Sequence, residues 1–164
     1  MATFCAAQHG RLVGSLTLYC GDRDVAEVLA QETLVLVCRD WNRVRTMAAP
    51  AAWAHRVGLN LANSWYTRRR AERRATERLS ARPDGRRDVD PTDAIAVRQA
   101  VAALPPRRRM ALILRYYVDL PVDQVAALMR CRPGTVKALT AQAVAQLRDR
   151  GGLADEEPSD VRPA

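Results

Sequence analysis

The sequence has few aromatic residues, almost no lysine and no long apolar run. Aromatic side chains make up 5% of the 164 residues, and Lys137 is the one lysine among 26 basic residues. Small helical modules that bury Leu, Val and Ala suit this balance better than an aromatic-rich β-sandwich. No stretch approaches the roughly 18 apolar residues of a membrane span, and the N-terminus lacks the pattern of a secretion signal. We therefore expect a cytoplasmic protein without a membrane segment.

The four cysteines are not spaced like metal ligands, and three of them lie within apolar helical patterns. The sequence therefore predicts buried, reduced thiols. Cys5 and His9 have the i, i+4 spacing of one edge of a zinc site, but two ligands are too few to hold zinc. There is also no Ser/His/Asp set and no phosphate-binding glycine loop. We expect no metal, no cofactor and no enzymatic activity.

The net charge of +8 is concentrated in two blocks. Residues 1–70 contain nine basic and five acidic residues, and residues 94–150 contain ten basic and three acidic residues. Two basic blocks indicate two contacts with a polyanion. Between them, residues 71–93 are neutral and contain prolines and a glycine, which predicts a flexible linker. Residues 151–164 carry a net charge of −3 and are predicted to be a disordered acidic tail.

Apolar residues recur at helical spacing through both basic blocks, and no β-hairpin signal is present. The fold class predicted is all-α, with two small helical domains, 1–70 and 94–150, joined by a flexible linker. Gly21 should end the first helix and Asp22 should cap the second. In the first domain the predicted helices cover residues 3–19, residues 23–40 and a segment from Pro50 into the arginines 68–70. In the second domain, a first helix starts near Asp93 behind a cap at Asp90. It is followed by a helix over 107–118, a short helix from Pro121 and a last helix over 132–150.

Residues 121–148 have the pattern of a helix-turn-helix, whose second helix fits the DNA major groove. The apolar set of the last helix is Val136, Thr140, Ala143 and Leu147, which directs the opposite face outward. From the pattern alone, an ordinary helical hairpin with solvated charges is the alternative. The outward face, which is the predicted DNA-reading surface, consists of Arg132, Thr135, Lys137, Ala138, Leu139 and Gln142.

Residues 104–148 contain a series of short segments in a characteristic order: Leu104-Pro105-Pro106, Leu114-Arg115-Tyr116-Tyr117, Val125-Ala126, Gly134-Thr135-Val136-Lys137 and Leu147-Arg148. In these segments the chain resembles the C-terminal domain of the extracytoplasmic-function sigma factors of bacterial RNA polymerase, within the sigma-70 superfamily and of the actinobacterial sigma-E-like type. The resemblance implies that this domain reads the minus-thirty-five promoter element in duplex DNA and docks on the polymerase β flap.

The N-terminal half is similar to the other sigma domain. Gly21-Asp22, Ala26-Glu27, Gln31-Glu32 and Trp41 match the segment that binds the clamp helices of the β′ subunit. The resemblance implies that core polymerase binds the residues of one helical face, namely Asp24, Glu27, Gln31 and Glu32. A solvated helix face is the alternative for these acids.

Residues 50–70 look like the helix that engages the minus-ten element. An opened promoter needs base-edge hydrogen bonds, aromatic stacking and phosphate contacts. The loop over residues 46–49 is where the family captures a flipped base. Core packing is the preferred interpretation for Trp53, and it remains open for Trp65. The predicted minus-ten residues are Arg56, Asn60, Asn63, Trp65, Arg68, Arg69 and Arg70.

The chain departs from the family pattern at a few positions. Arg130 stands where many relatives carry a turn glycine, and a non-glycine residue at positive φ would cost about 1 kcal/mol. Arg132 replaces the usual serine cap, and Val28 and Ser64 replace acids. We expect a sigma factor that binds core RNA polymerase and promoter DNA, and an anti-sigma factor is a further candidate partner. The alternatives are a stand-alone helix-turn-helix regulator and a decayed sigma factor that sequesters polymerase.

Overall fold

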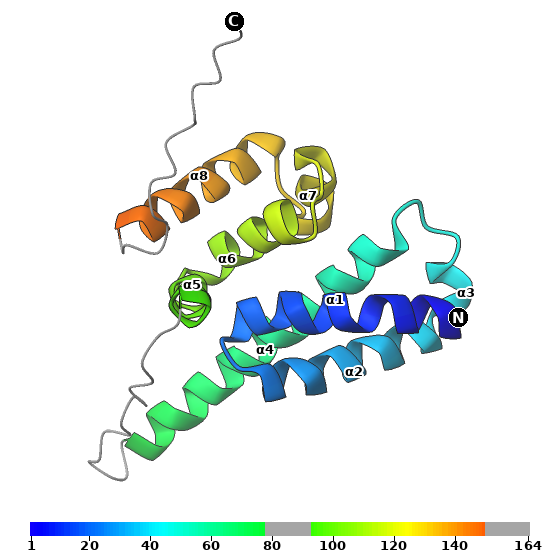
Figure 1. Ribbon diagram of the computed structural model, residues 1–164, viewed down its shortest axis with the longest axis horizontal. Coiled ribbons are helices and arrows are strands. Elements are labelled where there is room, and N and C mark those ends of the chain that lie inside the picture. Colours follow the sequence, from blue (N-terminus) through cyan, green and yellow to red (C-terminus); the bar gives the residue numbers. More distant parts are fainter. Residues whose placement is uncertain (78–92, 150–164) are drawn as a thin grey trace, which may run out of the picture.

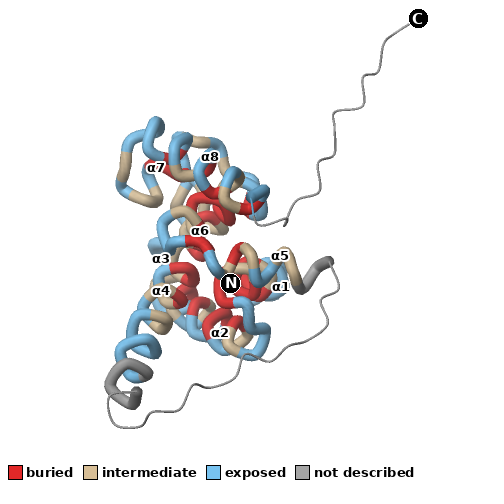
Figure 2. The backbone as a smooth tube through the Cα atoms, turned by 90° about the vertical axis from the view of Figure 1, so that its left-hand side faces the viewer, coloured by how far each residue is buried: buried red, intermediate tan, exposed pale blue. Residues whose placement is uncertain are grey.

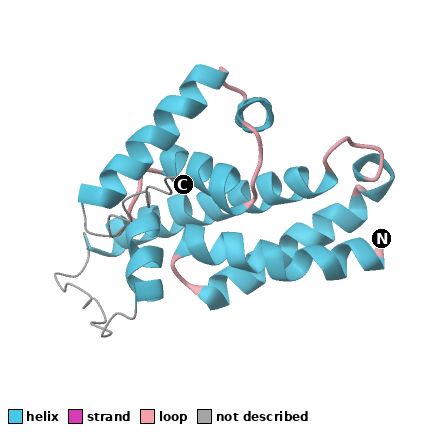
Figure 3. Cartoon of the chain, turned by 45° about the horizontal axis from the view of Figure 1, so that its top comes forward, coloured by secondary structure: helices cyan, strands magenta, loops and turns pink. Residues whose placement is uncertain are grey.

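A computed structural model describes residues 1–77 and 93–149, and these residues form helices and loops without any strand (Figure 3). The all-α prediction is confirmed for this part of the chain. Most of the predicted linker, the predicted cap at Asp90 and the acidic tail lie outside the described residues. The boundaries of the two predicted domains therefore stay a prediction.

Four helices make up the N-terminal half: α1 (Ala2–Cys20), α2 (Arg23–Arg39), α3 (Trp41–Val44) and α4 (Pro50–Glu77). Gly21 ends α1 in the left-handed conformation at φ 71°, which glycine adopts without a steric cost. The Asp22 side chain caps α2 by accepting hydrogen bonds from the backbone N–H groups of Asp24 at 2.9 Å and Val25 at 3.2 Å. Both sequence predictions at this corner are confirmed, whereas the short helix α3 was not foreseen.

Helices α1, α2 and α4 pack against one another around a core of aliphatic side chains (Figures 1 and 2). Leu12, Leu16 and Leu59 are fully buried in it. Helix α4 continues to Glu77, seven residues past the predicted end of the domain. Trp53 is partly buried and packs against the core, as the sequence predicted. The bundle therefore leaves the outer faces of α2 and α4 free for other contacts.

The C-terminal half contains α5 (Asp93–Ala102), α6 (Pro106–Leu112), the π-helical turn η1 (Ile113–Tyr117), α7 (Val122–Met129) and α8 (Pro133–Asp149). Helices α6 and α7 both pack on α8. The single helix predicted over 107–118 is interrupted, because Val118 N–H bonds to the carbonyl of Ile113. Such a turn widens the helix locally, and it leaves Tyr116 64% exposed.

The two halves also pack on each other. Helix α1 contacts both α5 and η1, and the buried core runs without a break from Leu16 to Leu114. Gly14 lies against Tyr117 at this contact, and a Cβ at that position would overlap the Tyr117 hydroxyl and force the side chain to move. The sequence predicted two separate modules and gave no sign of this contact.

Arg109 is the main polar contact between the halves. It is 7% exposed, and its Nη1 donates a hydrogen bond of 2.6 Å to the carbonyl of Tyr19 in α1. Its Nη2 donates to the carbonyl of Leu104 at 2.8 Å. The guanidinium also lies over the rings of Tyr19 and Tyr66, at 4.7 and 5.4 Å from their centroids. One arginine of the C-terminal half is thus inserted between α1 and α4.

Candidate polymerase and nucleic-acid interfaces

Helices α7 and α8 form the predicted helix-turn-helix. The four side chains predicted to face inward, Val136, Thr140, Ala143 and Leu147, are all buried. Between the helices, Arg130 has φ 51° and ψ 51°, so the turn does require a left-handed residue where the chain has arginine. The geometry is that of a DNA-reading unit with a small amount of backbone strain at its turn.

The outward face of α8 is exposed near its N-terminal end and partly covered by Arg108 further along. Four predicted reading residues are exposed: Arg132, Thr135, Lys137 and Ala138. Leu139 is partly covered. Gln142 is exposed, but its Oε1 accepts a hydrogen bond of 3.1 Å from Arg108 Nε, and Arg108 Nη1 also bonds to Gln146 at 3.1 Å. The first two turns of α8 are therefore the part available to a base edge.

The outer face of α2 combines acidic and apolar side chains. Asp24, Gln31 and Glu32 are exposed, as predicted. Val28 and Val35 lie about two turns apart on the same helix and are 57% and 66% exposed. Exposed aliphatic side chains beside carboxylates are typical of a surface that docks a partner carrying both apolar and basic groups.

A groove of about 390 Å³ runs between α2 and α4. Asp24, Val28 and Glu32 line it from α2, and Trp65 and Arg68 line it from α4. The structure thus brings part of the predicted polymerase-binding set together with part of the predicted minus-ten set.

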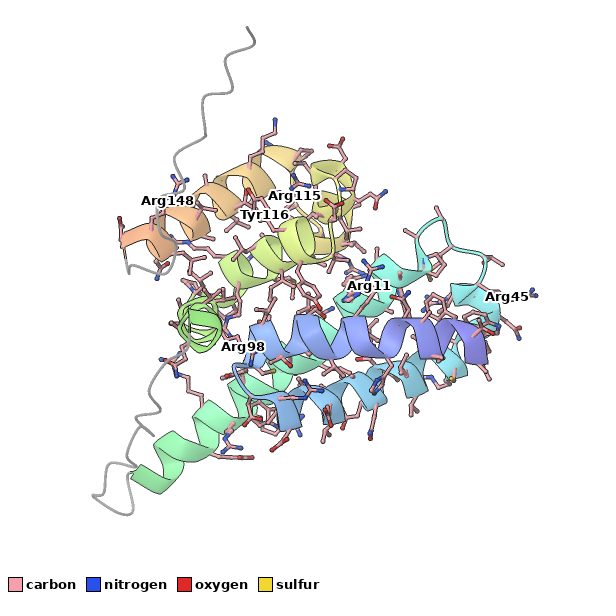
Figure 4. All side chains as sticks on the ribbon, viewed as in Figure 1. Arg11, Arg45, Arg98, Arg115, Tyr116 and Arg148 are labelled. Carbon is pink, nitrogen blue, oxygen red and sulfur yellow. The ribbon has the colours of Figure 1, made fainter. Side chains whose placement is uncertain are left out.

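Glu27 lies on the other flank of α2. Its Oε1 is 3.1 Å from Arg23 Nε, in a solvent-exposed ion pair. It lines a separate groove of about 330 Å³ with Arg98 of α5 and Tyr117 of η1, and Figure 4 shows Arg98 beside α1. Such an exposed pair contributes little to stability, roughly 0–1 kcal/mol, so Glu27 remains available to a partner.

The predicted minus-ten residues divide between two faces of α4. At about 100° per residue, Arg56, Asn60, Asn63 and Arg70 share one face. Of these, Asn60 and Arg70 are exposed, while Asn63 Oδ1 accepts a hydrogen bond of 3.3 Å from the Tyr19 hydroxyl. This face can present amide edges and a guanidinium to a nucleic-acid strand.

Trp65 and Arg68 project from the other side of α4. Trp65 is partly buried, meets Tyr66 edge-on at a centroid separation of 5.3 Å, and has the Arg69 guanidinium 5.0 Å from its ring centroid. Tyr66 in turn donates a hydrogen bond to the carbonyl of Cys20. Trp65 therefore cannot stack on the same base that Asn60 reads, and the sequence did not separate the two faces.

Basic side chains occur on both halves of the molecule (Figure 4). Arg45 lies in the loop after α3 and Arg148 lies near the end of α8, on opposite sides of the view. This distribution agrees with the two basic blocks of the sequence and with two contacts on one polyanion.

A family profile described as sigma-70, region 4 matches residues 94–147, which include α7 and all but the last two residues of α8. The RNA polymerase sigma-E factor of Streptomyces antibioticus is 30% identical over 128 residues, covering 76% of this chain and 69% of that protein. This chain belongs to the extracytoplasmic-function RNA polymerase sigma factors. Members of this family bind core RNA polymerase and promoter DNA and direct promoter-specific initiation of transcription.

Further comparisons agree with the assignment of this chain to the sigma factors. The sigma-E factor of Streptomyces coelicolor is 26% identical, covering 76% of this chain and 70% of that protein. The sigma-H factor of Pseudomonas aeruginosa is 25% identical, covering 80% and 75% of the two chains. The crystal structure of the sigma factor RpoE in complex with the anti-sigma factor NepR from Bartonella quintana superposes with a TM-score of 0.72. That likeness covers 90% of this chain and 94% of that one at 20% identity, so it shows the fold.

Sequence reasoning missed the two arginines of this sigma factor that organise its C-terminal half. Arg108 holds Gln142 and Gln146 of α8, and Arg109 reaches into the N-terminal half. Both follow the Pro105-Pro106 break, and the arginine run 107–109 was the available signal. Charge alone does not tell a buried arginine from a solvated one.

The cysteine prediction needs a correction. Cys20 is buried and burial raises the pKa of its thiol to about 12, but Cys38 is exposed, and Cys5 and Cys131 are partly exposed. The apolar pattern misled because Cys38 lies on a side of α2 that the bundle leaves exposed, although its neighbour Val37 in the same turn is buried. Among the described residues, no three His, Cys, Asp or Glu side chains are grouped as metal ligands. No helix in residues 1–77 or 93–149 is long and apolar enough to cross a membrane.

Proposed function

We propose that this sigma factor binds core polymerase through the outer face of α2, made of Asp24, Glu27, Gln31 and Glu32 together with Val28 and Val35. The observation that carries the proposal is the exposure of carboxylates and aliphatic side chains on one helix of a protein with a net charge of +8. A protein that bound DNA alone would gain nothing from an acidic, apolar surface. A basic, amphipathic partner such as the β′ clamp helices complements it.

We assign binding of the melted minus-ten strand to one face of α4, which is formed by Arg56, Asn60, Asn63 and Arg70. Amide side chains read base edges, and guanidinium groups neutralise phosphates. Trp65, Arg68 and Arg69 line the opposite side of α4, so in this assignment they contact DNA or polymerase at the groove beside α2. Asn63 is available to a base once its hydrogen bond with Tyr19 is exchanged.

For the minus-thirty-five element, we assign base and phosphate contacts to the exposed start of α8. Arg132 and Lys137 supply positive charge, and Thr135 and Ala138 are small enough to let the helix approach base edges. Leu139 and Gln142 belong to the same predicted face. Gln142 can contribute to readout only after Arg108 releases it, because Arg108 Nε donates a hydrogen bond to the amide oxygen of Gln142.

The packing of the two halves requires an opening step. The two promoter elements are centred at positions minus thirty-five and minus ten, so they are about 25 base pairs apart; this spacing is roughly 85 Å along B-DNA at 3.4 Å per base pair. A compact chain of 164 residues has a radius of gyration of about 15 Å. The packed halves therefore cannot occupy both elements, and we infer that the contact around Arg109 breaks when the factor loads onto polymerase and promoter.

The crystallised Bartonella factor has an anti-sigma factor as its partner. We infer that this chain is also controlled by an anti-sigma protein, and that it works in the cytoplasm with its polymerase. We assign it no catalytic role of its own, since RNA synthesis belongs to the polymerase.

Run-off transcription tests the proposal. Core polymerase from the organism that encodes the chain is incubated with a library of its promoter fragments, with and without the protein. Discrete transcripts that need the protein, and that weaken in Arg132→Ala/Lys137→Ala, are expected. Binding to duplex DNA without any need for core would favour a stand-alone regulator. Core binding without transcripts would favour a decayed factor that sequesters polymerase.

A further inference from the structure

Two cysteines from different helices face each other at one end of the N-terminal bundle. The Sγ atoms of Cys5 in α1 and Cys38 in α2 lie 3.7 Å apart, although the residues are 33 positions apart in the sequence. Both thiols are free. Thiols from separate elements that share a hydrogen bond are within reach of a covalent bond, since a disulfide needs the sulfur atoms about 1.7 Å closer than this.

The packing around the pair holds the two helix ends in place. Cys5 lies in the first turns of α1, and Cys38 lies in the last turn of α2. Beside them, the rings of Phe4 and Trp41 meet at a centroid distance of 5.4 Å. Phe4 precedes Cys5 in α1, and Trp41 begins α3 three residues after Cys38. The aromatic contact therefore holds together the two stretches of chain that carry the sulfur atoms.

We propose that Cys5 and Cys38 form a reversible dithiol–disulfide couple that is oxidised by low-molecular-weight disulfides. In the first step, the Cys38 thiolate attacks the small disulfide, forms a mixed disulfide and expels one small thiolate. In the second step, the Cys5 thiol loses its proton and attacks the sulfur of Cys38, which expels the second small thiolate. The two cysteines lose two electrons and two protons, and the small disulfide is reduced to two thiols.

The different environments of the two sulfurs set this order. Cys38 is exposed, so a solvent-borne disulfide can reach it. Cys5 is partly covered, and burial, followed by the hydrogen bond and charge of Cys38, raises the pKa of the Cys5 thiol. A thiol with a raised pKa is a poor first nucleophile but a strong one once it is deprotonated next to its target. Cys38 is therefore the attacking residue and Cys5 the resolving residue.

Formation of the bond would tie the start of α1 to the end of α2. The 33-residue separation means that the crosslink removes substantial freedom from the unfolded chain. We expect the thermal midpoint of the oxidised protein to exceed that of the reduced protein by about 5–10 °C. This inference does not depend on which surfaces bind polymerase or DNA.

A glutathione redox titration of the full chain tests the couple. Samples equilibrated at different ratios of reduced to oxidised glutathione are alkylated with N-ethylmaleimide, digested and analysed by mass spectrometry. Cys5 and Cys38 should lose alkylation together in one transition, with a crosslinked peptide that reductant removes. Cys38→Ser should abolish the crosslink and the shift in midpoint, while Cys131→Ser, a change in the other half of the molecule, should leave both intact.

Two outcomes would overturn the proposal. In one, Cys38 accumulates as a mixed disulfide with glutathione while Cys5 stays open to alkylation. In the other, the oxidised species is a dimer linked through Cys38, which shows that the neighbouring thiol is not the preferred partner.

Discussion

Arg109 joins the two halves, so replacing it should shift the molecule toward an open form. Methionine keeps the apolar stem of the side chain but is shorter and has no guanidinium. It therefore removes the hydrogen bonds to the Tyr19 and Leu104 carbonyls and the contacts with the Tyr19 and Tyr66 rings. A charge-assisted hydrogen bond contributes about 1.5–3 kcal/mol, and each cation–π contact contributes about 0.5–2 kcal/mol. Because such terms are not additive, we expect Arg109→Met to weaken the contact by about 2–4 kcal/mol.

That change corresponds to a factor of about thirty to several hundred in the ratio of closed to open molecules. Amide hydrogen exchange reports it directly, because amides protected only by this contact should exchange faster by the same factor. The peptides to follow cover the end of α1 and the whole of α5. The radius of gyration of Arg109→Met from small-angle X-ray scattering should rise above that of the wild-type chain.

Arg109→Lys is the matched control. It keeps the positive charge but loses the planar fork that serves two carbonyls at once, so we expect an intermediate effect. Far-UV circular dichroism should show the same helical content in all three proteins, since Arg109 joins packed helices and does not form them. Unchanged exchange and an unchanged radius in Arg109→Met would refute the role given to this residue.

Three further predictions follow from single residues. Gly14→Ala places a methyl group on the Tyr117 hydroxyl, so it should open the halves at a cost of about 1–3 kcal/mol, and Gly14→Ala/Tyr117→Ala should restore the compact radius. Arg130→Gly relieves the left-handed turn at φ 51° and should raise the free energy of unfolding in urea by about 1 kcal/mol; a lower midpoint would show that the arginine makes a compensating contact. Burial, with a smaller contribution from Arg11, lowers the pKa of His55 to about 4. The contribution of neutral His55 to stability is therefore complete above about pH 6.5, the pKa of histidine in the unfolded chain, and it is lost as the pH falls toward 4. His55→Gln should flatten this part of the stability–pH curve, and an equally steep curve in the variant would place the loss at other groups.

Ser15 is the hydrogen-bond partner of the His55 ring. Its Oγ lies 3.0 Å from the carbonyl of Leu12 and 2.9 Å from His55 Nδ1. With its one hydrogen directed to the Leu12 carbonyl, the Ser15 oxygen accepts a hydrogen bond from a protonated Nδ1. Nε2 is then the unprotonated nitrogen, and it is buried without a hydrogen-bond partner among the described residues. Protonating it would bury an unpaired charge, which agrees with the direction of the pKa shift.

The local rules of helix formation predicted much of this fold. Gly21 and Asp22 mark a helix boundary through chemistry that depends only on neighbouring residues. The inward set of α8, which begins with Val136, follows from helical spacing, and the structure confirms each member. Positive φ at Arg130 could also be anticipated, because the family pattern has a turn glycine at this position.

The features that escaped prediction depend on residues far apart in the sequence. The π-helical turn at Ile113 is accompanied by a hydrogen bond from Arg115 to the carbonyl of Leu120, which no periodicity reveals. The place of Arg109 between two tyrosines depends on how the halves pack. The division of the minus-ten set was within reach, since helical spacing puts Asn60 and Trp65 on different faces of α4.

The polymerase-binding face of α2 is the central claim, and one binding measurement tests it most directly. Core polymerase is titrated with the wild-type chain, with Glu32→Arg and with Asp149→Arg, which reverses an exposed charge at the end of α8. The account predicts that Glu32→Arg weakens binding by about tenfold or more, since a like charge then faces a basic partner. It also predicts that Asp149→Arg binds like wild type. Equal affinity of Glu32→Arg and wild type for core polymerase would contradict the account.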